Sequence, residues 1–548
     1  MQCRRVSAFV PWLLASTAGA QDEAPFTLAP VIHSGEAVIG MGALEGVFRT
    51  GIDDQGMWVA AVDTTFPDTS RDGAILRNGF VTLREGTALL APPGATQIGV
   101  FGAISLTDSG ELGLMLDFQA DLPRTGMFWN LVPAVVTGDP FVHPDLPAGT
   151  VWSKLLLGKM NENRQMLVLG EVQSPPETQR KQTLARYTVD ALGRVLSTEL
   201  LASRNLPMEA LGGDQLQSMP TTAQAIAQNN VGDFLCVVDG AVGEPAILLN
   251  METVLAQVNS PSPIEGLDWK YLDRAPHLAL NDLGEHVFTG STEDPASASN
   301  GLYTIVKNGA VFAREGDLIG AFTEPMGKDT ASPIYVANSG DVFWGWQDAD
   351  SSEFAFLRNH EPIVQAGVTR IGGNLVQSIP LQDGYDVSDD GRFWIGRANV
   401  QLLGETLLLV DFGLVLPIPG CGANPGRLSL ASGYALPGEA LVLSMDDGQA
   451  PGVRPVLFFS TAPRVQGSPC GASTPFGELL ISLGSRFGRV PMPAWNGTDP
   501  SLVSLAIPDE IALVDATVYV QGMFVDVAHT PADDIRLTNA LKIEIGAP

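Results

Sequence analysis

Basic residues and long apolar runs are both scarce in this chain of 548 residues. Lysine and arginine number 31 against 61 aspartates and glutamates, which gives a formal net charge of −30 at pH 7. Such an acidic chain repels nucleic acid and anionic membrane surfaces, so we exclude both as partners. The apolar run at residues 10–15 is too short to cross a bilayer, and no later segment supplies a long uninterrupted apolar run. We therefore expect no membrane span.

The first twenty residues have the layout of a secretory signal. Arg4 and Arg5 precede the short apolar run, and the small residues 18–20 are followed by an acidic stretch. This order predicts a signal peptide over residues 1–20, cleaved after Ala20. The mature protein is then expected to be secreted or held at the cell surface, with the periplasm as an alternative.

Cysteine is also rare, and only four are present. Cys3 would leave with the signal, and Cys236 lies in the apolar run FLCVV, where it should be a buried small hydrophobe. Cys421 and Cys470 lie in turn-rich segments of the same C-terminal region. In an oxidising compartment they are expected to form a disulfide, although two free thiols remain the alternative.

Sequence motifs of catalysis and of metal or nucleotide binding are missing. The six histidines are scattered, and the chain has neither His-Glu-x-x-His nor Cys-x-x-Cys. It also has no Gly-x-Ser-x-Gly elbow and no phosphate-binding Gly-Lys-Ser/Thr loop. The sequence thus predicts no catalytic residue, no metal ligand and no bound cofactor.

What the chain does contain is a turn that recurs seven times. An Asp or Asn is followed two positions later by Gly, or in one copy by Asn, and then by an apolar run. The pairs are Asp54 and Gly56, Asp108 and Gly110, Asn161 and Asn163, Asn230 and Gly232, Asp282 and Gly284, Asn338 and Gly340, and Asp389 and Gly391. Successive copies lie 51 to 56 residues apart, except for one interval of 69. A period near fifty with short strands is typical of propeller blades.

The chemistry of these turns explains the residue types. An Asp or Asn side chain can accept a hydrogen bond from the backbone N–H two residues on, which fixes the turn. The third position then needs a positive φ, which Gly adopts freely and Asn tolerates. None of the seven copies has the ligand set of a calcium loop. We interpret them as structural turns, with scattered calcium sites as the one cofactor alternative.

Each fuller repeat continues into a second hairpin. Residues 74–86 (AILRNGFVTLREG), 302–316 (LYTIVKNGAVFAREG) and 355–367 (AFLRNHEPIVQAG) share this pattern, and Asn-Gly is a strong hairpin signal. Residues 31–40 resemble the end of a repeat, whereas the last repeat stops near Gly413 without one. We therefore expect residues near 30–34 to supply the missing outer strand of the last blade, which removes an open sheet edge.

Composition changes after the last repeat. Residues 416–424 contain Pro417-Ile418-Pro419 and read as a linker. Beyond it, short apolar or alternating runs separated by Gly, Pro and Asp predict a β-sandwich over residues 425–548. The whole chain is therefore expected to be all-β, with a β-propeller over residues 21–415. Seven blades are favoured, and six or eight remain open because of the long interval.

These repeats resemble those of exported bacterial β-propeller proteins, whose blades end in Arg-Glu-Gly-Asp, as residues 314–317 do here. They are also similar to TolB-like Ser-x-Asp-Gly blades at residues 388–391. The end of the chain, from residue 501, resembles a C-terminal sandwich module of large exported bacterial proteins. The resemblance implies a fold and no catalytic residue.

The function predicted from these observations is that of a non-enzymatic binding or surface-associated protein, monomeric, with an unidentified protein or glycan as ligand. The alternative is a glycan hydrolase or lyase whose acidic residues converge on a central channel from different blades. Trp344 and Trp346 lie two apart on one face of a strand. With Trp394 they could stack on a sugar ring, but packing between neighbouring blades is the favoured interpretation.

Overall fold

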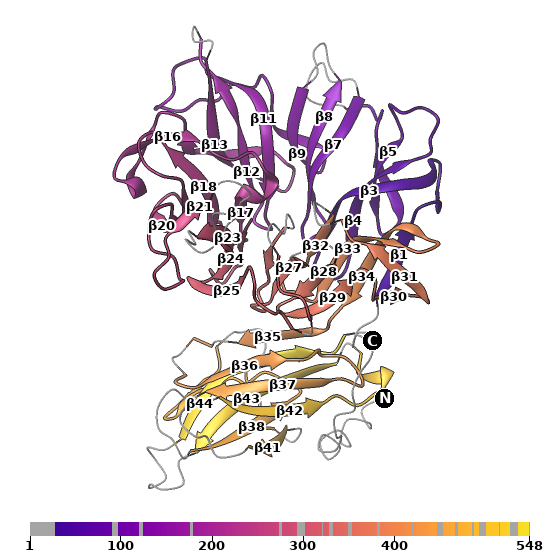
Figure 1. The fold of residues 1–548 in the computed structure, drawn as a ribbon, viewed down its shortest axis with the longest axis vertical. Helices are drawn as coiled ribbons and strands as arrows, with labels where there is room; N and C mark the ends of the chain where they lie inside the picture. The colour runs from indigo at the N-terminus through magenta and orange to yellow at the C-terminus, as the bar shows by residue number, and fades with distance from the viewer. Residues whose placement is uncertain are drawn as a thin grey trace. The chain divides into compact units, whose positions relative to one another are not determined.

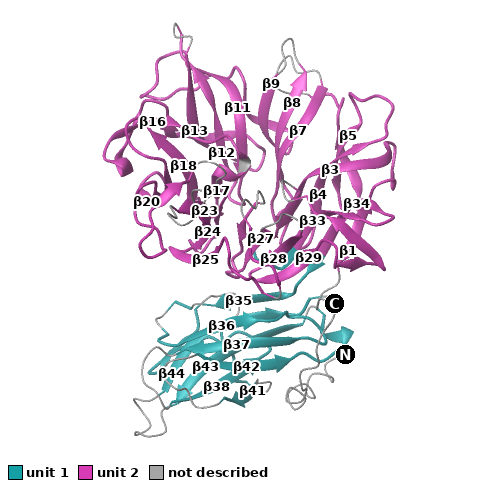
Figure 2. Cartoon of the chain, in the orientation of Figure 1, with its two compact units in different colours: residues 1–27, 390–393, 410–548 teal, residues 28–389, 394–409 magenta. Residues whose placement is uncertain are grey.

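The computed structural model (Figure 1) is all-β. It describes residues 28–89, 97–119, 124–175, 179–272, 277–292, 302–320, 322–327, 333–348, 353–380, 384–418, 420–421, 424–446, 453–465, 470–484, 487–492, 500–514, 516–525 and 535–546. The signal peptide predicted for residues 1–20 lies outside the described residues. The chain forms two compact units (Figure 2): residues 28–389 and 394–409 belong to unit 2, and residues 390–393 and 410–548 to unit 1.

In the described part of the chain, the strands before residue 412 form seven small sheets of four to six strands each. They are named here in chain order. Sheet 1 contains β2 (Ala37–Val38), β3 (Gly42–Ile52), β4 (Trp58–Thr64), β5 (Gly73–Arg77) and β6 (Phe80–Arg84). Sheet 2 contains β7 (Gln97–Leu106), β8 (Leu112–Gln119), β9 (Arg124–Trp129) and β10 (Val132–Val136). Sheet 3 contains β11 (Val151–Met160), β12 (Gln165–Gln173), β13 (Arg180–Val189) and β14 (Val195–Ser203).

The next two sheets each include one very short first strand that pairs with a longer one. Sheet 4 contains β15 (Pro207–Met208), β16 (Asp214–Ser218), β17 (Ile226–Gln228), β18 (Phe234–Gly240), β19 (Ala246–Leu249) and β20 (Thr253–Gln257). Sheet 5 contains β21 (Trp269–Tyr271), β22 (Leu278–Leu280), β23 (His286–Thr292), β24 (Leu302–Lys307) and β25 (Ala310–Arg314). Short 3₁₀ helices η3 (Glu209–Leu211) and η4 (Ala223–Ala225) lie beside the strands of sheet 4.

The last two sheets complete the series. Sheet 6 contains β26 (Tyr335–Val336), β27 (Val342–Gln347), β28 (Phe354–Arg358) and β29 (Glu361–Gln365). Sheet 7 contains β30 (Arg370–Ile371), β31 (Asn374–Ser378), β32 (Tyr385–Val387), β33 (Phe393–Val400), β34 (Gly404–Asp411) and β1 (Ala29–His33). The first strand, β1, thus lies in the last sheet.

The strand β1 confirms the prediction that residues near 30–34 complete the last repeat. It pairs antiparallel with β34, placing Ile32 opposite Leu407 and His33 opposite Thr406. Ile32 and Leu407 are both buried. The pairing covers an edge of sheet 7 that would otherwise present unpaired backbone groups.

The strand after each recurring turn is apolar and covered on both faces. In β4, β18 and β27 nearly every residue is buried, as expected for a strand sandwiched between neighbouring sheets. The strands before the turns contact one another in chain order: β3 with β7, β7 with β11, β11 with β17, β17 with β22, and β22 with β26. The contact between β3 and β32 joins the first sheet to the last.

Unit 1 contains two larger sheets and one hairpin within its described residues. One sheet has the order β35 (Leu414–Ile418), β44 (Ile535–Glu544), β43 (Thr517–Val525), β38 (Arg454–Ser460) and β41 (Phe487–Pro491). The other has the order β36 (Arg427–Ser432), β37 (Ala440–Asp446) and β42 (Ser501–Ala506). Strands β39 (Ala472–Thr474) and β40 (Gly477–Leu479) pair with each other, and η5 (Ile511–Leu513) follows β42. Buried side chains of both larger sheets, such as Leu443 and Phe524, form one apolar core.

The structure joins Cys421 to Cys470 by a disulfide, which confirms that prediction, with the two Cα atoms 5.0 Å apart. The buried carboxylate of Glu478 accepts a hydrogen bond from the backbone N–H of Cys421 at 2.7 Å and another from that of Gly471. Cys236 is a free, buried thiol whose pKa is raised to about 12 by burial. None of the helices in the described part of the chain has the length and apolar character needed to cross a membrane.

Candidate functional site

The seven recurring turns have one shared geometry. Each is a loop of four residues, and the fourth residue has a positive φ: Gly56, Gly110, Arg164, Gly232, Gly284, Gly340 and Gly391. In the first six turns the N–H of the fourth residue donates to the carbonyl of the first, at 2.8 to 3.4 Å. The first residues of these six are Asp53, Thr107, Asn161, Asn229, Asn281 and Ala337. The predicted pattern therefore marks the second and fourth residues of every turn except the third.

In the first, fourth and fifth turns the side chain that caps the turn belongs to its first residue, one position earlier than predicted. The Oδ1 atom of Asp53 accepts hydrogen bonds from the N–H groups of Gln55 and Met57 at 3.0 and 2.8 Å. Asn281 caps its own turn in the same way. The side chain of Asp282 instead makes a contact outside its own turn, since its Oδ1 accepts the N–H of Asn230.

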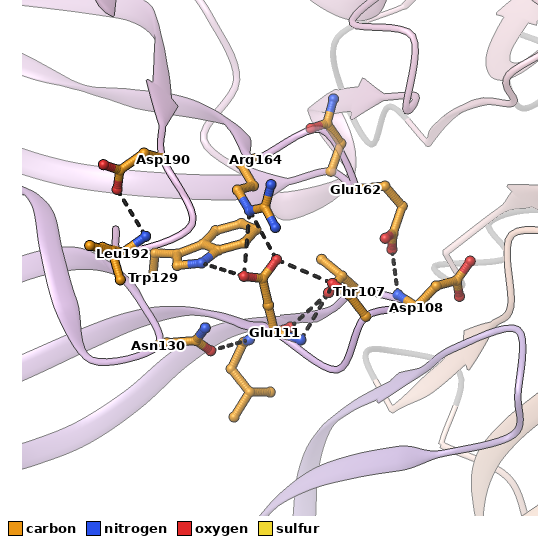
Figure 3. Close-up of polar contacts among 12 residues, drawn as sticks. Thr107, Asp108, Glu111, Trp129, Asn130, Glu162, Arg164, Asp190 and Leu192 are labelled. Atoms are coloured by element: carbon orange, nitrogen blue, oxygen red, sulfur yellow. Dashed lines mark hydrogen bonds and ion pairs between the residues drawn. The ribbon is translucent and has the colours of Figure 1, made fainter. Parts of the chain in front are cut away.

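The third turn corrects a prediction. Asn163 was expected to adopt the positive φ of the missing glycine, but Arg164 adopts it, with φ of 58°. The reason is that Asn161 is the capping first residue, since its Oδ1 accepts from Gln165 N–H at 2.9 Å. The strain at Arg164 is compensated by an ion pair, because its Nε lies 3.1 Å from Glu111 Oε2 (Figure 3). Glu162 is therefore the counterpart of Asp54 and Asp108.

The second residues of the turns are linked from sheet to sheet. We call them the turn ring: Asp54, Asp108, Glu162, Asn230, Asp282, Asn338 and Asp389. In five successive pairs the backbone N–H of one member donates to a side-chain oxygen of the next member, at 2.7 to 2.9 Å. Figure 3 shows one such bond, from Asp108 N–H to Glu162 Oε1. Asn338 N–H continues the series by donating to the backbone carbonyl of Asp389 at 2.7 Å.

Amide side chains strengthen the ring. Asn230 Nδ2 donates to Asp282 Oδ2 at 3.2 Å and to Asp389 Oδ2 at 2.7 Å, although Asp389 belongs to a sheet three places further along the chain. Beneath the ring, the buried Asn161, Asn229 and Asn281 each donate through Nδ2 to a carbonyl of the next turn, at 2.8 to 2.9 Å. The acidic and amide side chains of the turns thus mainly form hydrogen bonds that join one sheet to another.

The side chains of the turn ring, all of them among the described residues, do not form the cluster of ligands that a metal site needs. In the described part of the chain, three potential ligand atoms of His, Cys, Asp or Glu come within 4.8 Å of one another only at Cys421, Cys470 and Glu478. The two sulfurs there form the disulfide, so they are not available as thiolate ligands. Calcium binding at the turns stays an untested prediction.

A cavity of about 440 Å³ lies inside unit 2, next to the turn ring. Residues from all seven sheets line it, mainly from the strands that precede the turns. Two positions before the first residue of each turn, the chain has Gly51, Ser105, Lys159, Ala227, Ala279, Tyr335 and Asp386. All but Gly51 line the cavity. Four of the seven are small, and they leave room in the cavity for the three larger residues Lys159, Tyr335 and Asp386.

Lys159 and Asp386 are the charged members of this layer. Burial lowers the pKa of Lys159, and the negative charge of Asp386 opposes that effect. Burial raises the pKa of Asp386 to about 7, and the charge of Asp389 adds to it. Asp386 Oδ2 accepts the N–H of Ile52 at 3.2 Å, and the Tyr335 hydroxyl also hydrogen-bonds to this carboxylate.

Glu162 is a member of the turn ring whose pKa is raised. Burial raises its pKa to about 7, helped by the charges of Asp108, Asp389 and Asp53, and opposed by the hydrogen bond from Asp108 N–H. Because the folded pKa lies above the unfolded value, the native state binds the extra proton more tightly. The stability that this proton provides is complete below about pH 4.5 and is lost as the pH rises through about 7.

The variant Glu162→Gln tests this assignment. Glutamine keeps an oxygen that can accept the Asp108 N–H but carries no charge at any pH. We expect the melting temperature of the variant to exceed that of the wild type at pH 8 and to differ little from it at pH 5, by differential scanning calorimetry. The exposed Glu324 offers the control, since Glu324→Gln should leave the pH dependence unchanged. An equal shift at both pH values would contradict the assignment.

The three tryptophans considered for sugar stacking are packing residues. Trp344, Trp346 and Trp394 are each at most 1% exposed. Trp346 stacks on Phe322 with ring centroids 3.9 Å apart, and Trp394 packs against Phe356. A ligand cannot reach faces that are already covered, so the packing interpretation is confirmed.

Comparison with known proteins assigns neither a family nor a function to the chain. No family model and no curated protein matches the chain. A solved extracellular domain of a putative hybrid two-component system from B. thetaiotaomicron aligns over 95% of this chain and 58% of its own, with 10% identity and a TM-score of 0.32. PorZ, a surface component of the type-IX secretion system of Porphyromonas gingivalis, aligns over 92% and 84%, with 10% identity and a TM-score of 0.18. The present chain thus spans little more than half of the first of these, and at such TM-scores the likeness assigns no function.

Proposed function

We propose that the chain is an exported binding protein built on a seven-bladed β-propeller, with its ligand site in the cavity beside the turn ring. Three features support the propeller: seven consecutive small sheets, contacts between the strands that precede the turns, and the pairing of β1 with β34. The shared core of the two sheets in unit 1 supports a β-sandwich there. The disulfide supports an extracellular or periplasmic location.

The observation that carries the binding role is the cavity, to which every sheet of unit 2 contributes. Its volume of about 440 Å³ lies in the range of small-ligand sites. Most carboxylates of the adjoining ring are already engaged as hydrogen-bond acceptors. This favours recognition over catalysis, with a small glycan or a side chain of a protein ligand as the occupant.

A cavity-filling variant tests this role. Ser105 lines the cavity and is half-buried, so Ser105→Trp should obstruct it. The matched control is Ser197→Trp, at an exposed position of β14. The probes are a glycan array and a peptide array, followed by calorimetric titration of each hit. We expect a hit whose binding falls at least tenfold in Ser105→Trp and is unchanged in Ser197→Trp. No hit on either array, or binding indifferent to Ser105→Trp, would overturn the proposal.

Glycan cleavage is the second candidate, and one observation favours it. Glu162 and Asp386 both line the cavity, and the pKa of each is raised to about 7. Such carboxylates can hold a proton at neutral pH and could serve as a general acid and base. Turnover of a glycan substrate that disappears in both Glu162→Gln and Asp386→Asn would replace the binding role by this one.

A further inference from the structure

We propose that Lys159 is a nucleophile that forms an imine with small aldehydes or ketones entering the cavity. Lys159 lies on β11, two positions before a turn, and its side chain lines the cavity. This inference rests on the proposed role of the cavity as a ligand site, and it names the carbonyl group as the chemistry recognised. The open-chain form of a reducing sugar is one such ligand.

The first supporting observation is the space around Lys159. Ser105, Ala227 and Ala279 occupy the equivalent positions in three other sheets and also line the cavity. Their side chains are too short to fill the space that a lysine crosses. The cavity that Lys159 lines therefore has room for a small molecule beside it.

The second observation is that the amine has no partner. Among the residues that the structure describes, none forms a hydrogen bond or an ion pair within 4 Å with Nζ of Lys159. Lys159 is partly buried, and the partial burial of an ammonium group without such partners favours the neutral amine. The lowered pKa of Lys159 agrees with this. A neutral lysine amine is the form that attacks a carbonyl carbon.

The third observation is a proton carrier in the same layer. Asp386 lines the same cavity and interacts electrostatically with Lys159. With a pKa of about 7, its carboxyl group can both accept and donate a proton near neutral pH. The other ionisable groups that line the cavity are Arg49, Glu162, Tyr335, Tyr385 and Asp389.

The reaction balances without a further reagent. The lone pair of Nζ forms a C–N bond with the carbonyl carbon, the C=O π electrons move to the oxygen, and protonated Asp386 donates its proton to that oxygen. The nitrogen then passes one proton to the Asp386 carboxylate. Asp386 returns that proton to the hydroxyl group, the C–O bond breaks, and water leaves as the C=N bond forms. The nitrogen finally releases its remaining proton to Asp386, which is thereby restored to its starting form. The sum is one amine and one carbonyl compound giving one imine and one water.

Reductive trapping tests the proposal on the purified chain. The protein is treated with glycolaldehyde and cyanoborohydride at pH 7, and the modified lysines are located by peptide mass mapping. Lys154 is the internal control, because it lies on the same strand and is exposed. We expect Lys159 to be trapped several-fold faster than Lys154, since the lowered pKa of Lys159 leaves more of its amine neutral at pH 7. Equal rates, or faster trapping at Lys154, would overturn the proposal.

Two variants separate this inference from the binding role. Asp386→Asn should slow trapping at Lys159 and leave trapping at Lys154 unchanged, and an unchanged rate at Lys159 would remove Asp386 from the reaction. Ser105→Trp should protect Lys159 alone.

If the arrays yield no ligand but Lys159 is trapped selectively, the imine chemistry stands and the binding role as stated fails. If a ligand binds in the cavity and Lys159 is not trapped preferentially, the binding role stands and the nucleophile is wrong.

Discussion

Replacing Arg358 by methionine is expected to destabilise unit 2 by about 3–5 kcal/mol, because the change leaves a buried charge without its partner. Arg358 and Asp341 are both less than a tenth exposed. Arg358 Nε donates to Asp341 Oδ2 at 3.0 Å, and Asn359 Nδ2 donates to the other carboxylate oxygen at 2.6 Å. Methionine fills a similar volume but supplies neither the charge nor the hydrogen bonds.

The same ion pair sets a dependence on pH. Burial by itself would raise the pKa of Asp341, but the charge of Arg358 and the hydrogen bonds from Arg358, Asn359 and Ser339 outweigh it, so the pKa is below its usual range. A carboxyl group with a lowered folded pKa stabilises the native state above the unfolded pKa. That contribution is lost as the pH falls through the folded value. In Arg358→Met the main opposing charge is gone, so the deficit should be largest at neutral pH and smaller near pH 4.

Guanidinium unfolding followed by tryptophan fluorescence measures the stability of unit 2 at each pH, because seven of the nine tryptophans lie in unit 2. The control is Arg314→Met, which breaks the exposed ion pair with Asp317 and should cost at most about 1 kcal/mol. The double variant Asp341→Asn with Arg358→Met should regain part of the loss, since the buried charge is removed. Equal losses in the two single arginine variants would contradict the assignment.

The sequence predicted the recurring turns and much of their surroundings. Glycine at a fixed place after an Asp or Asn is a local signal, and it located six of the seven turns in the correct register. The hairpin asparagines Asn78, Asn308 and Asn359 also have positive φ, as their Asn-Gly or Asn-His context indicated. The Oδ1 atom of each of these three also accepts a hydrogen bond from the N–H of the first residue of a neighbouring strand. That second role depends on strand pairing and has no local signature.

The sequence failed where the signal was short or non-local. Strands β17, β22, β26 and β32 have two or three residues each, too few to show a periodic pattern. Without them the positions that face the cavity could not be recognised. Lys159 and Asp386 are 227 positions apart and share a layer only because their turns are equivalent. Counting back two residues from each turn would have identified both, but only with the third turn in its correct register.

The closing strand is the place where a single substitution should have the largest effect. Ile32 is 5% exposed in β1 and lies opposite Leu407 of β34, whereas Ile39 is 84% exposed seven residues later. Ile32→Asp removes a buried apolar side chain and places a carboxylate in its position. We expect a loss of about 4 kcal/mol or more in the stability of unit 2. Ile39→Asp should cost about 0.5 kcal/mol or less.

The comparison of these two variants also bears on how the sheets are held together. If β1 closes the series, Ile32→Asp releases the edge of β34, and its exposed backbone groups should promote association between chains. We therefore expect larger particles in light scattering for Ile32→Asp and none for Ile39→Asp, measured at the same concentration and below the unfolding transition. Small and equal effects would mean that sheet 7 is stable without its N-terminal strand. A large effect confined to Ile32 would mean that β1, the first described strand, stabilises sheet 7. Because β32 of sheet 7 contacts β3 of sheet 1, it would then stabilise the whole series of seven sheets.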